Sequence, residues 1–456
     1  MLCYNMRLHQ RGKSQRRTEA LNLYIDPGTG SMLFAILLGI AGAVNFVFRN
    51  AIVKLKFLFS GGRNVEANDD VIPYAIFSDD KRYWNVFEPV CRELDARGID
   101  VVYLTASEDD PAFECGLEHV RASFLGEGNK AFAKLNLLKA TILLSTTPGL
   151  DVYQWKRSKD TRCYVHILHA AGEVVLYRMF GLDYYDCVLV AGQMQVDNIR
   201  ELEKKRSLPA KEIAFTGIPY MDEMRDRLLK SGEVPEHPRT VLLAPSWGTN
   251  AIFTKHGGAI IGELLETGYH VIVRPHPQSF KSETQMIEKI MAEYPESDQL
   301  EWNRDVDNFE VLRRSDILIS DYSGVIFDFA LVYDKPIIYT DAHFNLDPYD
   351  AWWMDGELWT YSALPRLGME LTDGRERPLK ELIDECLEDP RFAKGRDDIR
   401  DEVWQCRGEG AVKTADWLIA KYAELAKASA SEDTGVETSE DTGANEDAVS
   451  NEKTSA

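Results

Sequence analysis

Short runs of Val, Ile and Leu alternate along this chain with stretches in which apolar residues recur every three to four positions. The runs lie at residues 71–77, 101–104, 140–144, 163–168, 187–191, 213–215, 241–244, 270–273, 316–319 and 336–339. A short, continuous apolar run is typical of a strand that is buried on both faces of a parallel sheet. The intervening stretches, such as 84–97 and 259–267, have the spacing of crossover helices. The pattern therefore predicts an α/β fold built on parallel sheets.

A polar segment with two prolines, 232–238, divides the alternating pattern into two sets. We expect a Rossmann-like N-terminal lobe over residues 70–231 and a Rossmann-like C-terminal lobe over residues 239–427, because each set has enough strands and helices for one such lobe. The last predicted helices, around 379–387 and 411–426, are expected to close the second lobe. Two lobes that face a cleft are therefore predicted.

The N-terminal part of the chain carries a candidate membrane segment. Residues 31–48 contain no charged side chain and, at about 18 residues, reach the lower limit for spanning a bilayer. We expect a basic segment at 1–28 and a membrane helix with its juxtamembrane stretch at 29–63. An anchor is favoured over a cleaved signal peptide, because no small-residue cleavage site follows the apolar run. A buried helix of the globular part is the alternative, and positive charges on both flanks leave the orientation open.

Composition changes the picture for partners and for the C-terminus. The formal net charge of −22 disfavours a nucleic-acid binder, which needs a basic face. Residues 428–456 are rich in Ser, Glu, Asp and Thr and nearly free of large apolar residues, so this acidic tail is predicted to be disordered. The cysteines are scattered and form no Cys-x-x-Cys pair, so neither a disulfide framework nor a zinc site is expected. We predict no metal site and no cofactor.

Polar residues follow two predicted strands of the second lobe at the point where each strand ends. Arg274 and His276 come directly after one strand, within Arg-Pro-His-Pro, and Ser-Asp-Tyr-Ser-Gly at 320–324 follows another. Ligands of open α/β sheets bind outside the carboxyl ends of the strands, so these residues are expected to face one crevice. Ser323 and Gly324 also begin a predicted helix, whose free N–H groups and dipole attract anions. Together these features predict a phosphate or diphosphate site.

Further residues are candidates for shaping that site. Asp321 is expected to orient His276 or to accept a hydrogen bond from a sugar hydroxyl, and Tyr322 beside it is expected to contact the donor. Another strand end supplies three candidates for the lining of the donor pocket, which are Ser246, Trp247 and Gly248. The donor site is thus predicted to draw on three strand ends of the second lobe.

His169 follows the apolar run 164–168 in the first lobe, so it is expected to reach the cleft from the opposite side. An imidazole titrates near neutral pH and suits a general base that takes a proton from an acceptor hydroxyl. His166 is the competing candidate, but it points to the other face if the strand is regular. The adjacent acids Asp79 and Asp80 are explained by a solvated turn.

These motifs resemble those of the CDP-glycerol glycerophosphotransferase family, which builds teichoic acid and related polyol-phosphate polymers. The resemblance rests on Ala-Pro-Ser-Trp-Gly at 244–248, Arg-Pro-His-Pro at 274–277 and the sequence at 320–329. Thr-Gly-Ile-Pro-Tyr-Met-Asp at 216–222 matches a Gly-x-Pro-x-x-Asp pattern of this and related two-lobed families. In the first lobe the family carries a Trp-His-Gly-Thr type sequence. This chain keeps a histidine there as His169, and the residues that follow it differ.

The resemblance implies a GT-B-like enzyme, with an acceptor lobe followed by a donor lobe. Such an enzyme moves a polyol phosphate, most simply glycerol phosphate, from a CDP-activated donor to a hydroxyl of a lipid-linked or polymeric acceptor and releases CMP. His169 and His276 would be catalytic. The lobes would lie in the cytoplasm, at the inner membrane, since the donor is made inside the cell. One alternative is a glycosyltransferase that uses a UDP- or GDP-sugar, and another is a non-catalytic, membrane-anchored protein that binds nucleotides or polymer intermediates.

Overall fold

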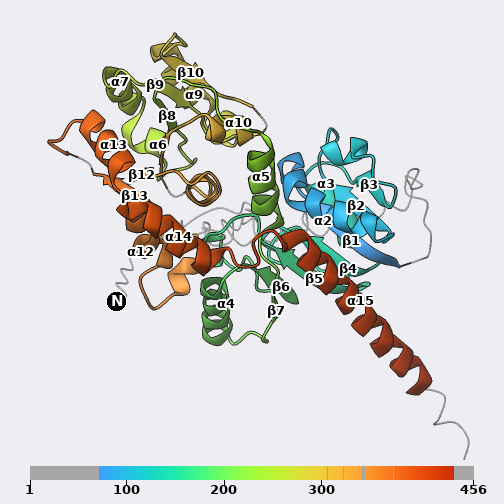
Figure 1. Cartoon of the computed structure of the whole chain (residues 1–456). Coiled ribbons are helices and arrows are strands. Elements are labelled where there is room, and N and C mark those ends of the chain that lie inside the picture. The colour runs from blue at the N-terminus through green and yellow to red at the C-terminus, as the bar shows by residue number, and fades with distance from the viewer. Residues whose placement is uncertain (1–70, 306, 322, 341–344, 373, 436–456) are drawn as a thin grey trace, which may run out of the picture. The chain divides into compact units, whose positions relative to one another are not determined.

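The computed structural model of the chain describes residues 71–305, 307–321, 323–340, 345–372 and 374–435 (Figure 1). The predicted basic segment 1–28 and the predicted membrane helix within 29–63 lie outside the described residues. Among the helices of the described ranges, none has both the length and the apolar character needed to cross a bilayer.

The first lobe is built on a sheet of seven parallel strands in the order β3-β2-β1-β4-β5-β6-β7. Its strands are β1 (Ile72–Ser78), β2 (Val101–Thr105), β3 (Val120–Phe124), β4 (Ala140–Ser145), β5 (Thr161–Ile167), β6 (Cys187–Val190) and β7 (Glu212–Phe215). Its main helices are α2 (Trp84–Ala96), α3 (Asn129–Leu135), α4 (Gln193–Arg206) and α5 (Pro219–Lys230). Every residue of β4 is buried, as expected for a central strand with both faces covered.

The second lobe has a sheet of six parallel strands in the order β10-β9-β8-β11-β12-β13. Its strands are β8 (Thr240–Leu243), β9 (His270–Val273), β10 (Leu300–Trp302), β11 (Ile317–Ser320), β12 (Ile337–Thr340) and β13 (Gly368–Leu371). Its helices include α6 (Ile252–His256), α7 (Ala259–Glu266), α8 (Ser279–Ser282), α9 (Thr284–Glu293), α10 (Phe309–Arg313), α12 (Trp359–Leu367), α13 (Leu379–Glu388) and α14 (Arg391–Val403). The predicted α/β fold with two Rossmann-like parallel sheets is confirmed.

Each sheet reverses its strand order at one place, between β1 and β4 in the first lobe and between β8 and β11 in the second. The loops that leave the carboxyl ends of such neighbouring strands diverge, one to each side of the sheet, and leave a crevice between them. A ligand site is therefore expected beyond the ends of β1, β4 and β5 in one lobe and of β9, β8 and β11 in the other.

The last helix, α15 (Gly410–Gly435), packs on the first lobe, beside α2 and β4 (Figure 1). Its residues Ala415 and Leu418 are buried in the core that β1 and α2 form, and the ring of Tyr422 lies 5.0 Å from that of Tyr74. The prediction that this helix closes the second lobe is wrong, because apolar spacing specifies a buried face and leaves open which sheet covers it. The helix also continues into the predicted disordered tail, of which residues 436–456 lie outside the described part.

A buried carboxylate fixes the place where the chain returns from the second lobe to the first. Asp222 of α5 accepts hydrogen bonds from the Trp404 indole N–H at 3.0 Å and from the backbone N–H groups of Gly408 and Gly410, both at 2.8 Å. A Cβ atom on Gly410 would lie 2.6 Å from the carboxylate, so only glycine permits this approach. The Gly-x-Pro-x-x-Asp motif thus serves to hold the returning chain.

A second buried carboxylate makes another contact between the two lobes. Asp350, between β12 and α12, accepts hydrogen bonds from the N–H groups of Phe180 at 2.6 Å and Gly181 at 3.0 Å. It also pairs with Arg206 of α4, which in turn pairs with Asp183. Because these charges are buried and paired with one another, they give the contact between the lobes a defined geometry.

We expect Asp222→Ala to destabilise the protein by about 2–4 kcal/mol, since it leaves the buried donors of Trp404 and Gly410 and the N–H of Gly408 without their acceptor. Urea unfolding followed by tryptophan fluorescence measures this loss. Asp226→Ala is the matched control, because Asp226 is an exposed acid on the same helix and its removal should change stability by less than about 0.5 kcal/mol. Equal effects of the two substitutions would contradict the assigned role of Asp222.

Candidate functional site

A cavity of about 170 Å³ lies between the two lobes, where the carboxyl ends of β5 and β11 face each other. His169 and Glu173 line it from the first lobe, and Asp321, Ser323 and Gly324 line it from the second. The segments are in close proximity, since a Cβ atom on Gly324 would lie 3.5 Å from that of Ala170. The structure therefore brings the predicted first-lobe histidine to the predicted helix start.

His169 lies among aromatic rings at the end of β5. Its Nδ1 is 2.8 Å from the hydroxyl of Thr146, which follows β4. Its ring lies 5.3 Å from that of Tyr83 and 6.0 Å from that of Tyr177. Burial lowers the pKa of His169 to about 4, because a charged imidazole would lose its hydration there. The side chain is therefore neutral at physiological pH and able to accept a proton.

His166, the competing candidate for the base, lies inside the first lobe. It is fully buried within β5, its Nε2 is 3.3 Å from the Tyr177 hydroxyl, and burial lowers its pKa to about 3. It is absent from the lining of the cavity, whereas His169 is part of it. The alternation of side chains along a strand, which predicted opposite faces for the two, accounts for this difference.

Arg274 and His276 lie beyond the end of β9, which β8 separates from β11, and do not line the cavity described above. The guanidinium of Arg274 donates hydrogen bonds to the Asn303 side chain and, at 2.8 Å, to the backbone carbonyl of Asp305. These bonds hold the guanidinium at the carboxyl edge of the sheet, and its partial burial lowers the pKa of Arg274 without removing the charge.

The tautomer of His276 follows from its hydrogen bond. The backbone N–H of Gln278 donates to Nδ1 of His276 at 3.1 Å, so in the neutral ring the proton sits on Nε2. Burial lowers the pKa of His276 to about 4, with the nearby cations Arg82 and Arg274 as lesser causes. His276 is thus a neutral donor of one hydrogen bond through Nε2, suited to a phosphate oxygen.

Asp321 is a buried anchor for the loop that follows β8. Its carboxylate accepts hydrogen bonds at 3.1 Å from the backbone N–H groups of Ser246 and Ile252. This loop carries Trp247, whose side chain is 38% exposed, and Gly248, whose N–H donates to Glu283 at 2.8 Å. Asp321 therefore holds in place the loop that carries the predicted lining residues. This structural role differs from the two roles that the sequence predicted for Asp321.

The predicted helix start after β11 has a different form from the one expected. The helix begins as α11 (Val325–Phe327) and continues as a π-helical segment at Asp328–Val332, and the residue at its N-cap position is Gly324. Ser323 therefore precedes the cap instead of forming it. Ser323 nevertheless lines the cavity. Tyr322 lies outside the described residues.

Glu173 is a residue of this site that the sequence analysis missed. Its carboxylate accepts hydrogen bonds from the N–H groups of Trp359 at 3.2 Å and Thr360 at 2.9 Å, and from the Thr360 hydroxyl at 2.7 Å. It thereby caps the N-terminus of α12 in the other lobe, which lacks a capping side chain of its own. The residues after His169 differ from the family's sequence, and this difference was the one indication in the sequence that Glu173 has a particular role.

The structure also corrects the prediction for Asp79 and Asp80, the two acids that follow β1. Asp79 accepts a hydrogen bond from the Thr147 hydroxyl at 2.9 Å, and Asp80 pairs with Arg82. Both acids are partly buried. Burial raises the pKa of Asp79, whereas Asp80 has a lowered pKa because its bonds to Arg82 outweigh the effect of burial. The interpretation of these acids as a solvated turn is therefore wrong.

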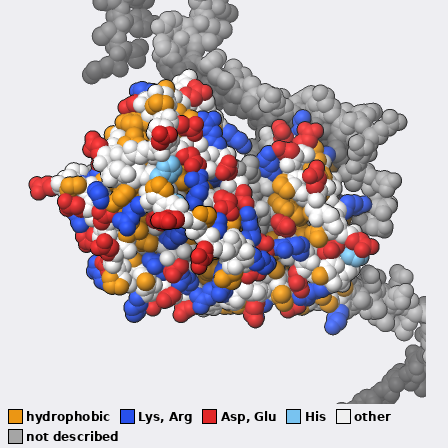
Figure 2. Space-filling view, turned by 45° about the horizontal axis from the view of Figure 1, so that its top comes forward, with side chains coloured by type: hydrophobic (Ala, Val, Ile, Leu, Met, Phe, Trp, Pro, Cys, Tyr) orange, Lys and Arg blue, Asp and Glu red, His pale blue; other side chains and the backbone are white. Residues whose placement is uncertain are grey.

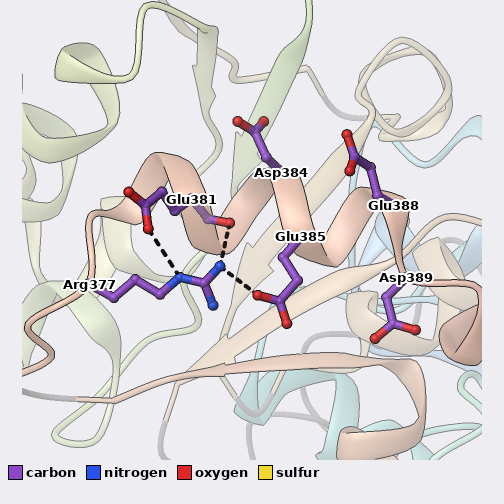
Figure 3. A pocket seen from close by; sticks show the side chains of 6 residues that line it. All are labelled: Arg377, Glu381, Asp384, Glu385, Glu388 and Asp389. Carbon is purple, nitrogen blue, oxygen red and sulfur yellow. Dashed lines mark hydrogen bonds and ion pairs between the residues drawn. The ribbon is translucent and has the colours of Figure 1, made fainter.

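A further surface hollow lies on α13, away from these strand ends. Arg377 bonds there to Glu381 and Glu385, and more acids complete the lining (Figure 3). An excess of carboxylates repels an anionic ligand, so this hollow does not fit a diphosphate. On the face shown in Figure 2, acidic and basic side chains are interspersed, without the continuous basic surface that nucleic acid requires.

Comparison with known families identifies a related group of proteins. Residues 182–352 match the family described as CDP-Glycerol:Poly(glycerophosphate) glycerophosphotransferase. The matched region contains Arg274, His276 and the residues after β11, whereas His169 and Glu173 precede it. No curated protein matches the sequence.

Several solved structures share the fold. A variant of the wall teichoic acid polymerase TagF, soaked with CDPG, has 14% identity and a TM-score of 0.51 over 85% of this chain and 97% of that chain. S. aureus MnaA, in a structure with UDP, has 11% identity and a TM-score of 0.53 over 78% of this chain and 97% of that chain. A putative UDP-N-acetylglucosamine 2-epimerase from Listeria monocytogenes has 11% identity and a TM-score of 0.50 over 75% and 94% of the two chains. At these identities the likeness shows the two-lobed, GT-B-like fold.

We expect His169 and His276 to titrate near pH 4, well below the ordinary histidine value of 6.5. NMR of the imidazole C–H groups, assigned with His169→Gln and His276→Gln, measures both. His119 is the internal control, because its hydrogen bond to Asp100 raises its pKa above 6.5. Since the unfolded chain binds more protons between pH 6.5 and pH 4, the stability from these two groups is complete above pH 6.5 and is lost as the pH falls towards 4. Titration of either group at 6.5 would contradict the burial described above.

Proposed function

We propose, from the match of residues 182–352 to the CDP-glycerol glycerophosphotransferase family, that this chain transfers a polyol phosphate from a CDP-activated donor to a hydroxyl group and releases CMP. The observation that carries this proposal is that the family match spans the strand ends of the second lobe, where Arg274 and His276 lie. Glycerol phosphate is the simplest polyol phosphate that fits the family. The fold alone does not decide the donor, since related folds use many nucleotides.

The reaction is a substitution at phosphorus. The acceptor hydroxyl oxygen forms a bond to the β-phosphorus of the donor, and the bond from that phosphorus to the oxygen that bridges the two phosphates breaks. CMP leaves with the bonding electron pair. The acceptor proton passes to Nε2 of His169, in the tautomer whose Nδ1–H donates to the Thr146 hydroxyl. The low pKa keeps this imidazole in the form that accepts a proton.

The second lobe supplies electrostatic stabilisation of the diphosphate. His276 donates through Nε2–H, because its Nδ1 accepts from Gln278. Arg274 adds a fixed positive charge, held by Asn303 and Asp305. Donors that are fixed before the reaction stabilise developing charge without reorganisation, and their positioning provides most of the catalysis in transfers of this kind.

The acceptor in this proposal is a lipid-linked or growing polymer chain, and residues 29–63 hold the enzyme at the inner membrane with its lobes in the cytoplasm. The support is the apolar sequence at 31–48 and the chemistry of the donor. The full-length protein is expected to float with phospholipid vesicles in a density gradient and to stay with them in a high-salt wash. Recovery of the protein at the bottom of the gradient would contradict membrane association.

We expect the purified full-length chain to release CMP from CDP-glycerol and to release no UDP from UDP-sugars, as measured by chromatography of the nucleotides. His169→Ala should lower acceptor-dependent transfer by about 10²–10⁴-fold, the usual contribution of a general base. His276→Ala should lower CMP release by about 10²–10³-fold, as for the loss of one fixed donor.

The control for both variants is His119→Ala, which removes a surface histidine of the first lobe and should leave the rate unchanged. Release of UDP in place of CMP would replace the proposal by the glycosyltransferase alternative. Unchanged turnover in the His276 variant would show that the second-lobe site has been misplaced.

A further inference from the structure

We infer that Arg82 of the first lobe contacts the β-phosphate of the donor from across the cleft and so completes the diphosphate site of the second lobe. This inference rests on the proposed function and names a residue that lies outside every motif discussed for that function. Arg82 belongs to a short 3₁₀ turn, Lys81–Tyr83, directly after β1. Strand β1 is one of the two strands at the switch point of the first sheet, so the turn lies where a ligand is expected.

The guanidinium of Arg82 is fixed by its neighbour. Asp80 accepts hydrogen bonds from Nε at 2.8 Å and from Nη2 at 3.3 Å, so its carboxylate takes one edge of the planar group. The same carboxylate accepts the Arg82 backbone N–H at 3.0 Å and thereby caps the turn. Nη1 is not among the atoms that Asp80 engages. A guanidinium held in this way is prepared for a phosphate oxygen at its other edge.

Two pairs of charged or titratable groups connect this turn to the second lobe. Arg82 acts electrostatically on His276, where it is the largest cause of the lowered pKa after burial. Asp80 acts in the same way with Lys281 of α8, which follows His276 closely in the sequence. The adjacent residue Tyr83 packs against His169, with ring centroids 5.3 Å apart. The turn therefore lies against His169, and its arginine is close enough to His276 to act on that histidine electrostatically.

The chemistry of the site calls for a further cation at this position. Arg274 is partly committed to Asn303 and Asp305, and His276 is neutral, so the second lobe offers limited positive charge to a donor with several negative oxygens. The β-phosphate must lie between the base and the donor-binding residues for the reaction to occur. Arg82, which acts electrostatically on His276 and adjoins the tyrosine that packs against His169, is placed to neutralise its charge as the acceptor attacks.

The test compares Arg82→Gln and Arg82→Lys with Lys81→Gln in the full-length protein. Lys81 is the matched control, because it is a cation of the same turn that pairs with Asp109 at the surface. We expect Arg82→Gln to lower kcat/KM for CDP-glycerol by about 10²–10³-fold. Arg82→Lys should restore about a tenth or more of the lost activity, since it keeps the charge and loses the fork, and Lys81→Gln should stay within about 2-fold of the unaltered protein.

A pH profile separates this contact from a merely structural ion pair. Loss of the cation lets the pKa of His276 rise, so the NMR titration of the His276 imidazole should move to higher pH in Arg82→Gln and stay in place in Lys81→Gln. A capping role alone would lower the urea midpoint, leave the His276 titration unmoved and show no rescue by lysine. Activity of Arg82→Gln equal to that of Lys81→Gln would overturn the inference.

Binding of CDP, measured by calorimetry, distinguishes failure of the inference from failure of the proposed function. If the unaltered protein binds CDP about 10-fold or more tightly than Arg82→Gln but does not turn over CDP-glycerol, the diphosphate contact stands and the proposed reaction falls. If CDP-glycerol is turned over and both CDP affinity and rate are unchanged in Arg82→Gln, the reaction stands and the contact falls. Should Arg82→Gln fail to fold, Arg82→Lys and the same two measurements decide.

Discussion

Asp222 accepts three hydrogen bonds from the segment by which the chain returns to its first lobe, and the arrangement of both lobes depends on this contact. The chain crosses between the lobes once near residue 238 and again near residue 404, so each lobe is tied to the other by two covalent connections. Glu173 and Asp350 add contacts nearer the cleft. The strand ends that carry His169 and Ser323 can then form one cavity.

Burial sets the protonation states in the cleft. His169 and His276 are both neutral because a desolvated imidazolium is costly, and the N–H of Gln278, which donates to Nδ1 of His276, leaves the proton of that ring on Nε2. Positive charge is left to arginines, which keep it when buried. A chain with a net charge of −22 thus presents cations at the one place where an anionic donor is proposed to bind.

The sequence predicted the central strands, because a strand in the middle of a parallel sheet is apolar on both faces and needs no partner to be recognised. It missed three strands at sheet edges, β3, β10 and β13. It also predicted that Arg274, His276 and Ser323 follow strands, since the ends of apolar runs are visible locally. Three features could not be predicted: the packing of α15 on the first lobe, the capping of α12 by Glu173 and the pairing of Asp80 with Arg82. The first two depend on contacts between segments that are distant in the sequence, and the third depends on the backbone conformation of one turn. Hydrophobic periodicity does not specify such contacts, and the sequence does not distinguish a solvent-exposed carboxylate from one that caps a helix.

The position of α15 has a consequence for how this protein is made. The core beneath β1 and α2 includes Ala415 and Leu418, residues that leave the ribosome only after the entire second lobe has been synthesised. A nascent chain usually folds its first domain while the next is being translated. Here the part of the first lobe's core that α15 covers stays open until the second lobe has been translated, which gives that apolar surface a long exposure to chaperones.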